Sequence, residues 1–478
     1  MILIPGFEEV KRPIFITDKE RLELDNVQNI LNEHQWFKSE KYYRNLKYYE
    51  GYHEILNRTM DDPKKPNNKI VVNLPSFTTD IRTGYFSGEP LTFSSEDDNI
   101  TEKINNILDY NDFQDINTEL DRLTSIYGHA FLILYIDKDA NIRLTTETPD
   151  NMVIVYDNSL EKNIVGAVRY YYYTDASDNE QKVYMTVYNK DMIEYYNGKV
   201  GAPELVDIEE NYFKDIPVVE FMENENRKGC YEDAISIVDA IESVISSSVN
   251  EIEYFDNAYL LLKNLAGTEK EDIDKMKENR VMLVEDDGDA EFITKTVNDD
   301  YTQNLLNRLV NDYHKVTKTP NLTDEKFAGN VSGVSLKFKL FALEKDMAKK
   351  ESKWKKSIQS MLELICTVLN IKGTSIDYRT IKITFTRALP TNTLEQAQMV
   401  SQLSGIVSRE TLLAQLDFIE NPKQEIKLID KEQEEQMKKF DMYADSDVVS
   451  DPKEDDKNAN NDNGMDNVND NGMDNVSI

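Results

Sequence analysis

A long amphipathic stretch of the sequence runs from Tyr231 to about Lys263, and it predicts one long helix. At about 1.5 Å of rise per residue, this helix would be roughly 45 Å long. Helices of that length rarely stay within one small core, so we expect this one to connect two regions of the chain. Its apolar residues recur at the three- and four-residue steps of a single helix face, at Ile235, Val238, Ile241, Val244, Ile245, Val249 and Ile252.

After this helix the chain is predicted to form a small module and then a second helix that returns toward the start of the first. Residues 319–333, TPNLTDEKFAGNVSG, have the composition of a mobile loop, and another long helix is predicted from about 334 to Leu369. Before that loop we expect a helix over 268–278, a strand over 280–285, a turn at Asp286-Asp287-Gly288-Asp289, a strand over 291–296 and a returning helix over 299–317.

Helices precede strands in the first half of the chain. Asn197-Gly198 predicts a type I′ hairpin turn. Short connections of this kind imply antiparallel pairing, so the predicted fold class is α+β rather than a doubly wound sheet. The predicted helices lie within 20–50 and over 73–83, 99–110 and 113–127, and the predicted strands lie near 141–147, 152–156, 164–173, 181–188 and 191–196.

The C-terminal part changes in composition. After a strand near 380–386, Pro390 opens a region with predicted helices over 393–404, 409–417 and 422–440. Residues 441–478 carry eleven acidic residues and two lysines and repeat the run Asn-Asp-Asn-Gly-Met-Asp-Asn-Val. A segment with so few apolar residues cannot build a core, so we expect it to be disordered.

The net charge of −34, from 89 acidic and 55 basic residues, restricts the kinds of molecule that this protein can bind tightly. Tight binding to a duplex depends on lysine and arginine displacing counterions, so we expect contact with DNA to be weak or local; solubility is the other interpretation of the acidity. The two cysteines, Cys230 and Cys366, form no CxxC pair, which indicates a reducing compartment. No signal peptide and no run of about 18 apolar residues is present, so we expect synthesis in the cytoplasm and no membrane partner.

Sequence motifs for catalysis are missing. The chain has no Walker A loop, no G-x-G-x-x-G, no G-x-S-x-G and no H-E-x-x-H. A carboxylate acid–base pair stays open because aspartate and glutamate are so abundant, whereas the acidic turn at 286–289 is interpreted as a hairpin. We assign no catalytic, cofactor-binding or metal-binding residue and expect no cofactor. The four histidines are interpreted as ordinary helix or strand residues: His34, His53, His129 and His314.

Lysines are concentrated in the helix predicted after residue 334. One interpretation, favoured by their spacing, is a solvated or intersubunit face that pairs with acidic neighbours. The other is a local cationic band near DNA. The series comprises Lys337, Lys339, Lys345, Lys349, Lys350, Lys353, Lys355 and Lys356.

Several short runs follow one another along the chain: 48–58 (YYEGYHEILNR), 66–73 (PNNKIVVN), 80–92 (DIRTGYFSGEPLT), 127–131 (YGHAF), Pro149-Asp150 and 226–230 (NRKGC). These runs and their order resemble the portal proteins of siphophages from Gram-positive hosts. The run 226–230, NRKGC, which leads into 233–245, is similar to the approach to that family's stem helix. Each run alone is weakly specific, but together they cover about residues 20–440, and the tail beyond 441 matches no portal element.

The resemblance implies a division of the chain into named regions. These are an N-terminal arm (1–19), an α+β wing (20–230), a stem helix (231–262), a clip (263–298), a second stem helix (299–318), a tunnel loop (319–333), a long wing helix and strand (334–390), a helical crown (391–440) and the acidic tail (441–478).

The resemblance also implies a function. Subunits would form a ring of about twelve at one vertex of the virion capsid, after assembly in the host cytoplasm, and double-stranded DNA would pass through it during packaging and ejection. The implied partners are the terminase large subunit, head–tail connector or adaptor proteins, and the major capsid and scaffolding proteins. The implied tunnel-loop residues are Asp324, Lys326, Phe327, Asn330 and Ser332, and Lys337, Lys339, Lys345 and Lys349 would form a channel or intersubunit face.

Two alternatives come from other classes of protein. One is an acidic, non-catalytic interaction protein that binds basic partners. The other is a nuclease, which would need carboxylates around one metal ion and a basic groove, and the composition offers no such groove.

Overall fold

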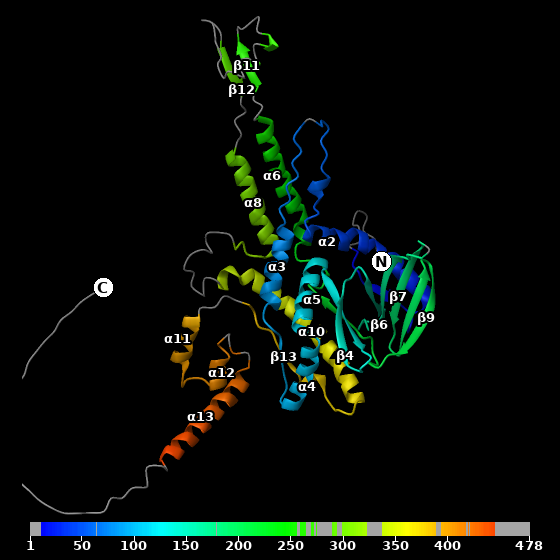
Figure 1. The fold of residues 1–478 in the computed structure, drawn as a ribbon, viewed down its shortest axis with the longest axis vertical. Coiled ribbons are helices and arrows are strands. Elements are labelled where there is room, and N and C mark those ends of the chain that lie inside the picture. Colours follow the sequence, from blue (N-terminus) through cyan, green and yellow to red (C-terminus); the bar gives the residue numbers. More distant parts are fainter. Residues whose placement is uncertain are drawn as a thin grey trace, which may run out of the picture. The chain divides into compact units, whose positions relative to one another are not determined.

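Helices and antiparallel sheets share the chain, which confirms the α+β prediction (Figure 1). The chain divides into two compact units, 1–390 and 391–478. The structure is a computed structural model that describes residues 11–63, 65–177, 179–255, 259–263, 269–271, 274, 289–293, 299–322, 337–388, 393–416, 419 and 421–444.

A six-stranded sheet forms one layer of the first unit, with the strand order β1-β5-β6-β7-β8-β9. All neighbours pair antiparallel except β1 and β5. Three predicted strands are confirmed to within one residue, but β1 and β9 were not predicted. The strands are β1 (Phe15–Thr17), β5 (Met152–Asp157), β6 (Ile164–Thr174), β7 (Gln181–Tyr188), β8 (Met192–Lys199) and β9 (Ala202–Glu210).

The predicted hairpin turn at Asn197-Gly198 is wrong by three residues. Both residues lie inside β8, and the pairing of Lys199 with Ala202 places the turn at Val200-Gly201. Gly201 has a φ of +87°, a backbone conformation that glycine adopts at no steric cost.

A smaller sheet organises the main core. Its strand order is β10-β3-β4, and helices α5 and α10 pack against it while α3 packs on α5. Helix α5 has the bounds predicted from its periodicity and from Gly128. The elements are β3 (His129–Ile136), β4 (Ile142–Glu147), β10 (Val218–Met222), α3 (Leu74–Ser87), α5 (Phe113–Tyr127) and α10 (Phe341–Ile371).

Further elements complete this core. Helices α1 and α2, joined by a π-helical turn, occupy the region where helical periodicity was predicted. The remaining bounds are α1 (Leu24–Phe37), α2 (Tyr43–Tyr49), α4 (Asp98–Tyr110), and the paired short strands β2 (Thr92–Ser94) and β13 (Lys382–Thr384).

Helices α6 (Ile235–Phe255) and α8 (Asp299–Thr317) pack together. The prediction of one helix as far as Lys263 is wrong, because Tyr259–Lys263 forms strand β11, which pairs antiparallel with β12 (Asp289–Ile293). A continuous apolar run such as Tyr-Leu-Leu-Leu suits a strand as well as a helix, so periodicity could not decide. The predicted strand over 280–285 and residues 286–288 of the predicted turn lie outside the described residues.

In the described part of the second unit lie the helices α11 (Thr393–Leu403), α12 (Arg409–Leu413) and α13 (Pro422–Ala444). The predicted start of the disordered tail at residue 441 is wrong, because helix α13 continues through residues 441–444. The rest of that tail lies outside the described residues. Among the helices that the structure describes, none has the length and apolar character needed to span a membrane.

Candidate functional site

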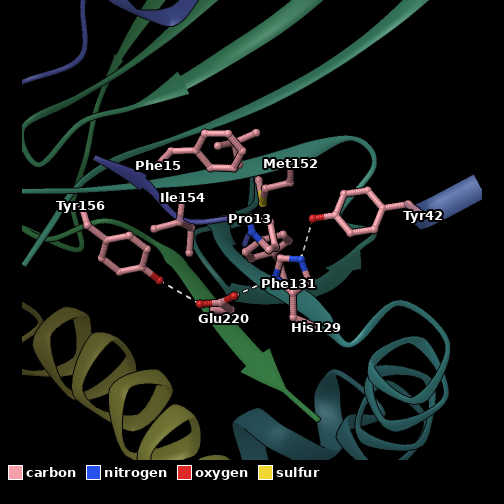
Figure 2. Close-up of a pocket in the computed structure, with 10 residues that line it drawn as sticks. Pro13, Phe15, Tyr42, His129, Phe131, Met152, Ile154, Tyr156 and Glu220 are labelled. Carbon is pink, nitrogen blue, oxygen red and sulfur yellow. Dashed lines mark hydrogen bonds and ion pairs between the residues drawn. The ribbon is translucent and has the colours of Figure 1, made fainter. Parts of the chain in front are cut away.

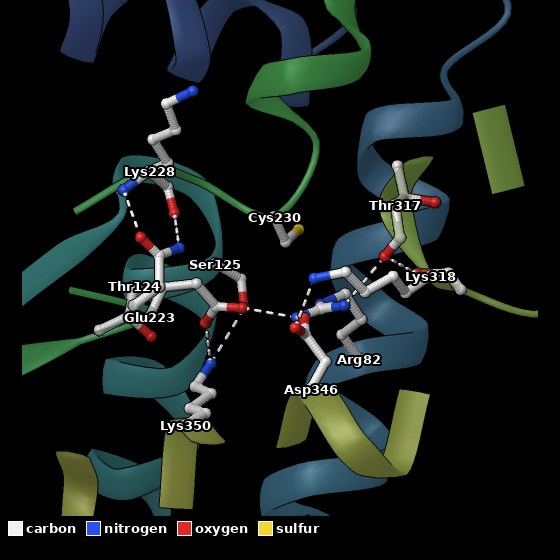
Figure 3. A network of polar contacts seen from close by, with 12 residues as sticks. Arg82, Thr124, Ser125, Glu223, Lys228, Cys230, Thr317, Lys318, Asp346 and Lys350 are labelled. Carbon is white, nitrogen blue, oxygen red and sulfur yellow. Dashed lines mark hydrogen bonds and ion pairs between the residues drawn. The ribbon is translucent and has the colours of Figure 1, made fainter. Parts of the chain in front are cut away.

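The two flanks of the predicted tunnel loop meet in the first unit. Residues 323–336 lie outside the described part of the chain, and so do the predicted loop residues Asp324, Lys326, Phe327, Asn330 and Ser332. The flanks are described: α8 ends at Thr317, followed by Lys318, and α10 carries Asp346 in its second turn. We call the charged cluster that joins these flanks the flank junction. It consists of Asp121 together with Arg82, Glu223, Lys318, Asp346 and Lys350, the last five of which are labelled in Figure 3.

Arg82 of α3 holds both flanks at once. It is buried, and it donates hydrogen bonds to the Thr317 carbonyl at 3.0 Å and to an Asp346 carboxylate oxygen at 2.8 Å. Lys318 donates to the other oxygen of Asp346 at 2.6 Å. The last carbonyls of a helix have no partner within it and favour a cation, so the end of α8 is a suitable place for a guanidinium.

Lys350 forms the second half of the flank junction. Its ammonium group contacts the carboxylates of Asp121 on α5 and Glu223 just after β10, and all three side chains are buried. Arg82 also pairs with Glu223 at 2.7 Å. One glutamate therefore joins the two buried cations, and the cluster balances three acidic residues against three basic ones.

The protonation states follow from this pairing. Burial alone lowers the pKa of Lys350, but Asp121 and Glu223 more than offset that effect, and the net pKa is raised. Burial raises the pKa of Glu223, and Lys350 and Arg82 reverse this, so the net pKa is lowered. Both groups are therefore charged at neutral pH.

Both interpretations of the lysine series assumed that its lysines lie on one face of the helix. The structure contradicts this for Lys350. Lys350 lies on the buried side of α10, between Met347 and Trp354, and its ammonium group is 5.1 Å from the ring centroid of Phe86. Among the lysines assigned to a channel or intersubunit face, Lys337, Lys345 and Lys349 are exposed and Lys339 is half-buried.

The flank junction has the chemistry of a structural clasp. Its nearest thiol, Cys230, has its pKa raised to about 12 by burial, so it is protonated at neutral pH and a poor nucleophile. Within the described ranges, no group of three or more histidine, cysteine, aspartate or glutamate side chains is placed to hold a metal ion.

A second buried cluster surrounds His129 (Figure 2). Its Nδ1 donates to Glu220 at 2.7 Å, and its Nε2 accepts from the Tyr42 hydroxyl at 2.8 Å. Arg227 binds both oxygens of Glu220, at 2.6 and 2.7 Å, and the Tyr156 hydroxyl donates to the same carboxylate at 2.8 Å. The cavity beside them has a volume of about 10 Å³, which is room for about one water molecule.

The side chains of the His129 cluster hold one another in place within the core. Burial lowers the pKa of His129 to about 4, with Glu220 opposing the shift, so the ring is neutral at pH 7. Both ring nitrogens are occupied, as they are in His34, which contacts Tyr170 and the Pro149 carbonyl. His53 is likewise held, between Glu242 and the Tyr48 carbonyl.

Sequence reasoning assigned none of the other five members of the flank junction to a site: Arg82, Asp121, Glu223, Lys318 and Asp346. For Lys350 a signal was present, because it occupies a core position of the stripe Leu343, Met347, Trp354, Ile358 and Met361. A charged residue inside an apolar stripe predicts a buried partner of opposite charge. Which partner it finds depends on contacts across 229 residues to Asp121 and 127 residues to Glu223.

Several known proteins are similar to this chain. Two curated proteins align with most of the chain: the portal protein of Bacillus phage SPP1, 24% identical over 95% of both chains, and that of Clostridium phage phiCD119, 22% identical over 78% of this chain and 87% of the relative. Among solved structures, a chain from the neck of a native gene transfer agent particle has a TM-score of 0.42 and 11% identity, over 72% of this chain and 90% of that one. The family model described as "Phage portal protein, SPP1 Gp6-like" matches residues 28–439, and the chain therefore belongs to this portal protein family.

Proposed function

We propose that this portal protein assembles into a closed ring of about twelve subunits at one vertex of the virion capsid, and that double-stranded DNA passes through the ring during packaging and ejection. The observation that carries the proposal is the family match over residues 28–439. It favours the portal function over an acidic interaction protein. We further propose the terminase large subunit, head–tail connector proteins, and the major capsid and scaffolding proteins as its partners.

The paired helices support the stem and clip regions. Helices α6 and α8 pack together, and the chain between them contributes the antiparallel pair β11–β12. We propose that α6 and α8 are the stem and that β11 and β12 belong to the clip, which moves the start of the clip to about residue 259. The wing, tunnel loop and crown keep the boundaries predicted from the sequence.

Half-exposed apolar side chains support an intersubunit role for the stem. On α6, Ile252 is 59% exposed, and Val244, Ile245 and Val249 are only partly buried. A subunit taken from a ring leaves its interface uncovered, so apolar surface of this kind is expected on a stem.

The acidity supports a channel through which DNA slides. The formal charge of −34 per subunit is multiplied by the ring, and a wall that repels phosphate lets a duplex move without being captured. The proposed role is mechanical, and ATP hydrolysis belongs to a separate terminase.

Deleting residues 322–331 is the direct test of the proposed channel function. We expect rings of unchanged subunit number, because the flank junction lies outside the deletion, and heads that package or retain less DNA. Ring number is measured by native mass spectrometry, and DNA per head is measured in particles assembled with the variant.

The matched control removes residues 461–468, one copy of the tail repeat, and should leave both readouts unchanged. Normal DNA content in heads that carry the 322–331 deletion would contradict the tunnel-loop role. Subunits that no longer assemble would contradict the placement of the loop.

A further inference from the structure

A groove lies where the six-stranded sheet meets the turn that follows β3. Its walls come from that turn, from β7 and β8, and from the end of β9 with the residues after it. Its volume is about 560 Å³, within the range of about 300–1,000 Å³ that is usual for ligand pockets. A pocket of this size holds more than one amino-acid side chain.

Four tyrosines line this groove, and we call it the tyrosine groove. Tyr135 is 43% and Tyr212 51% exposed. Tyr195 is half-buried and Tyr188 is buried. Tyrosine combines a large apolar ring with a polar hydroxyl, which is why it is enriched where proteins bind one another.

Further tyrosines continue this surface along the sheet. Tyr195 pairs with Thr186 of β7, and Tyr184 lies two residues before Thr186, so the side chains of Tyr184 and Tyr195 are on one face. The next strand adds Tyr171, which is 39% exposed and stacks on Tyr184 with the ring centroids 5.4 Å apart. The tyrosine groove is therefore the end of a larger aromatic face.

Carboxylates outnumber cations in the tyrosine groove. Asp137, Glu209 and Glu210 line it together with one lysine, Lys138. Lys214 pairs with Glu210 at 2.9 Å and compensates that charge. Asp137 and Glu209 remain against Lys138, so the groove keeps a negative charge that repels phosphate-bearing ligands such as nucleic acids and attracts cations.

Glu209 is placed to receive such a cation. Its Oε2 accepts a hydrogen bond from the Tyr195 hydroxyl at 2.9 Å, which holds the carboxylate beside an aromatic side chain. A guanidinium stacks on tyrosine rings and donates hydrogen bonds to a carboxylate, so an arginine satisfies both groups at once. The buried side chains of Ile193 and Phe213 line the same groove and suit an apolar neighbour of that arginine.

We propose that the tyrosine groove binds a basic segment of a partner protein, with an arginine against the tyrosine rings and Glu209 and an apolar residue against Ile193 and Phe213. Charge complementarity selects a basic segment. The volume and the apolar lining favour a peptide over a free polyamine, which has no apolar side chain. The proposal adds a binding surface to the first unit and does not depend on the subunit number of the ring.

Fluorescence anisotropy tests the binding with a defined probe. The probe is the labelled peptide GLRFLRG, and its control carries citrulline in place of both arginines, which removes the charge and keeps most of the shape. Full-length protein should bind the arginine peptide at least about tenfold more tightly, because hydrogen bonds to charged groups are stronger than neutral ones. Equal binding of the two peptides, or no binding of either, would contradict the proposal.

Two variants locate the binding in the groove. Tyr212→Ala and Glu209→Gln should each weaken binding of the arginine peptide about fivefold or more. Their matched controls are Tyr52→Ala, since Tyr52 is 63% exposed outside the groove, and Glu204→Gln, since Glu204 is exposed on the same strand as Glu209. The controls should change the affinity by less than about twofold. Equal effects of Glu209→Gln and Glu204→Gln would show that the peptide responds only to the net acidity of the chain, and the proposal would be wrong.

Photo-crosslinking distinguishes the other occupants. Lys138→Cys places a benzophenone maleimide at the rim of the groove, while the native Cys366 is buried and Cys230 is half-buried. Illumination with the arginine peptide should give a protein–peptide adduct, and spermidine at the concentration of the peptide should not suppress it. A crosslink to a second subunit or within the same chain that the peptide does not displace, or full suppression by spermidine, would overturn the proposal.

Discussion

Replacing Lys350 with alanine is expected to lower the free energy of unfolding by about 3–5 kcal/mol, the usual cost of removing one partner from a buried ion pair. Among the residues that the structure describes, the substitution removes the cation paired with Asp121 and leaves Glu223 paired with Arg82. Chemical denaturation followed by tryptophan fluorescence measures the effect. Trp354 is a suitable probe, because it is buried and its ring centroid is 5.5 Å from the Lys350 ammonium.

The adjacent Lys349 provides the control. It is exposed on the same helix, so Lys349→Ala should change stability by no more than about 0.5 kcal/mol. Lys350→Met keeps most of the side-chain volume and should remain strongly destabilising, since the loss arises from unpaired charge. Equal effects of Lys349→Ala and Lys350→Ala would show that the flank junction does not stabilise the fold.

Ile241→Pro is expected to have an effect at least as large. Ile241 is fully buried near the middle of α6, so proline removes a backbone hydrogen bond and clashes with the preceding turn. That alone costs about 3 kcal/mol or more per subunit, and the lost isoleucine packing adds to it. Unfolding by denaturant and ring assembly by native mass spectrometry are the two readouts.

Ile241→Ala separates the loss of side-chain packing from the effect of proline on the helix backbone. It keeps the helix while removing the side chain, and is expected to cost about 2–5 kcal/mol. The proline variant should exceed this by about 3 kcal/mol and should assemble poorly. A proline variant that folds and assembles normally would refute the assignment of α6 as a stem helix.

Local signals were sufficient for the helices whose ends are marked in the sequence. Helix α5 has its predicted bounds because the left-handed Gly128, with a φ of +92°, ends it, and α8 ends just before Lys318 and Pro320. The fold class also followed from local spacing, because short connections allow only antiparallel neighbours.

Tertiary pairing decided the elements that the sequence could not place. The apolar run of β11 becomes a strand because Tyr259–Lys263 pairs with Asp289–Ile293. The hairpin of β8 and β9 turns at Gly201 although Asn197-Gly198 fits the usual turn pattern, because the pairing continues to Lys199. Register depends on the partner strand, and a dipeptide signal does not contain it.

The flank junction was unpredictable for a similar reason. Its members come from α3, α5 and α10 and from the residues just after β10 and α8, and each alone is an ordinary charged residue in an acidic chain. The buried face of α6 shows the same limit: Glu242 and Ser246 are fully buried, and they accept hydrogen bonds from the backbone of Val72 and Ile70. Helical periodicity finds apolar faces and misses polar residues that are buried with partners.

The mass and symmetry of the purified full-length protein test the portal assignment most directly. Native mass spectrometry with averaging of particle images should give a closed ring of about twelve subunits around an open channel. A monodisperse monomer or dimer across a range of salt and protein concentrations would contradict the proposed function.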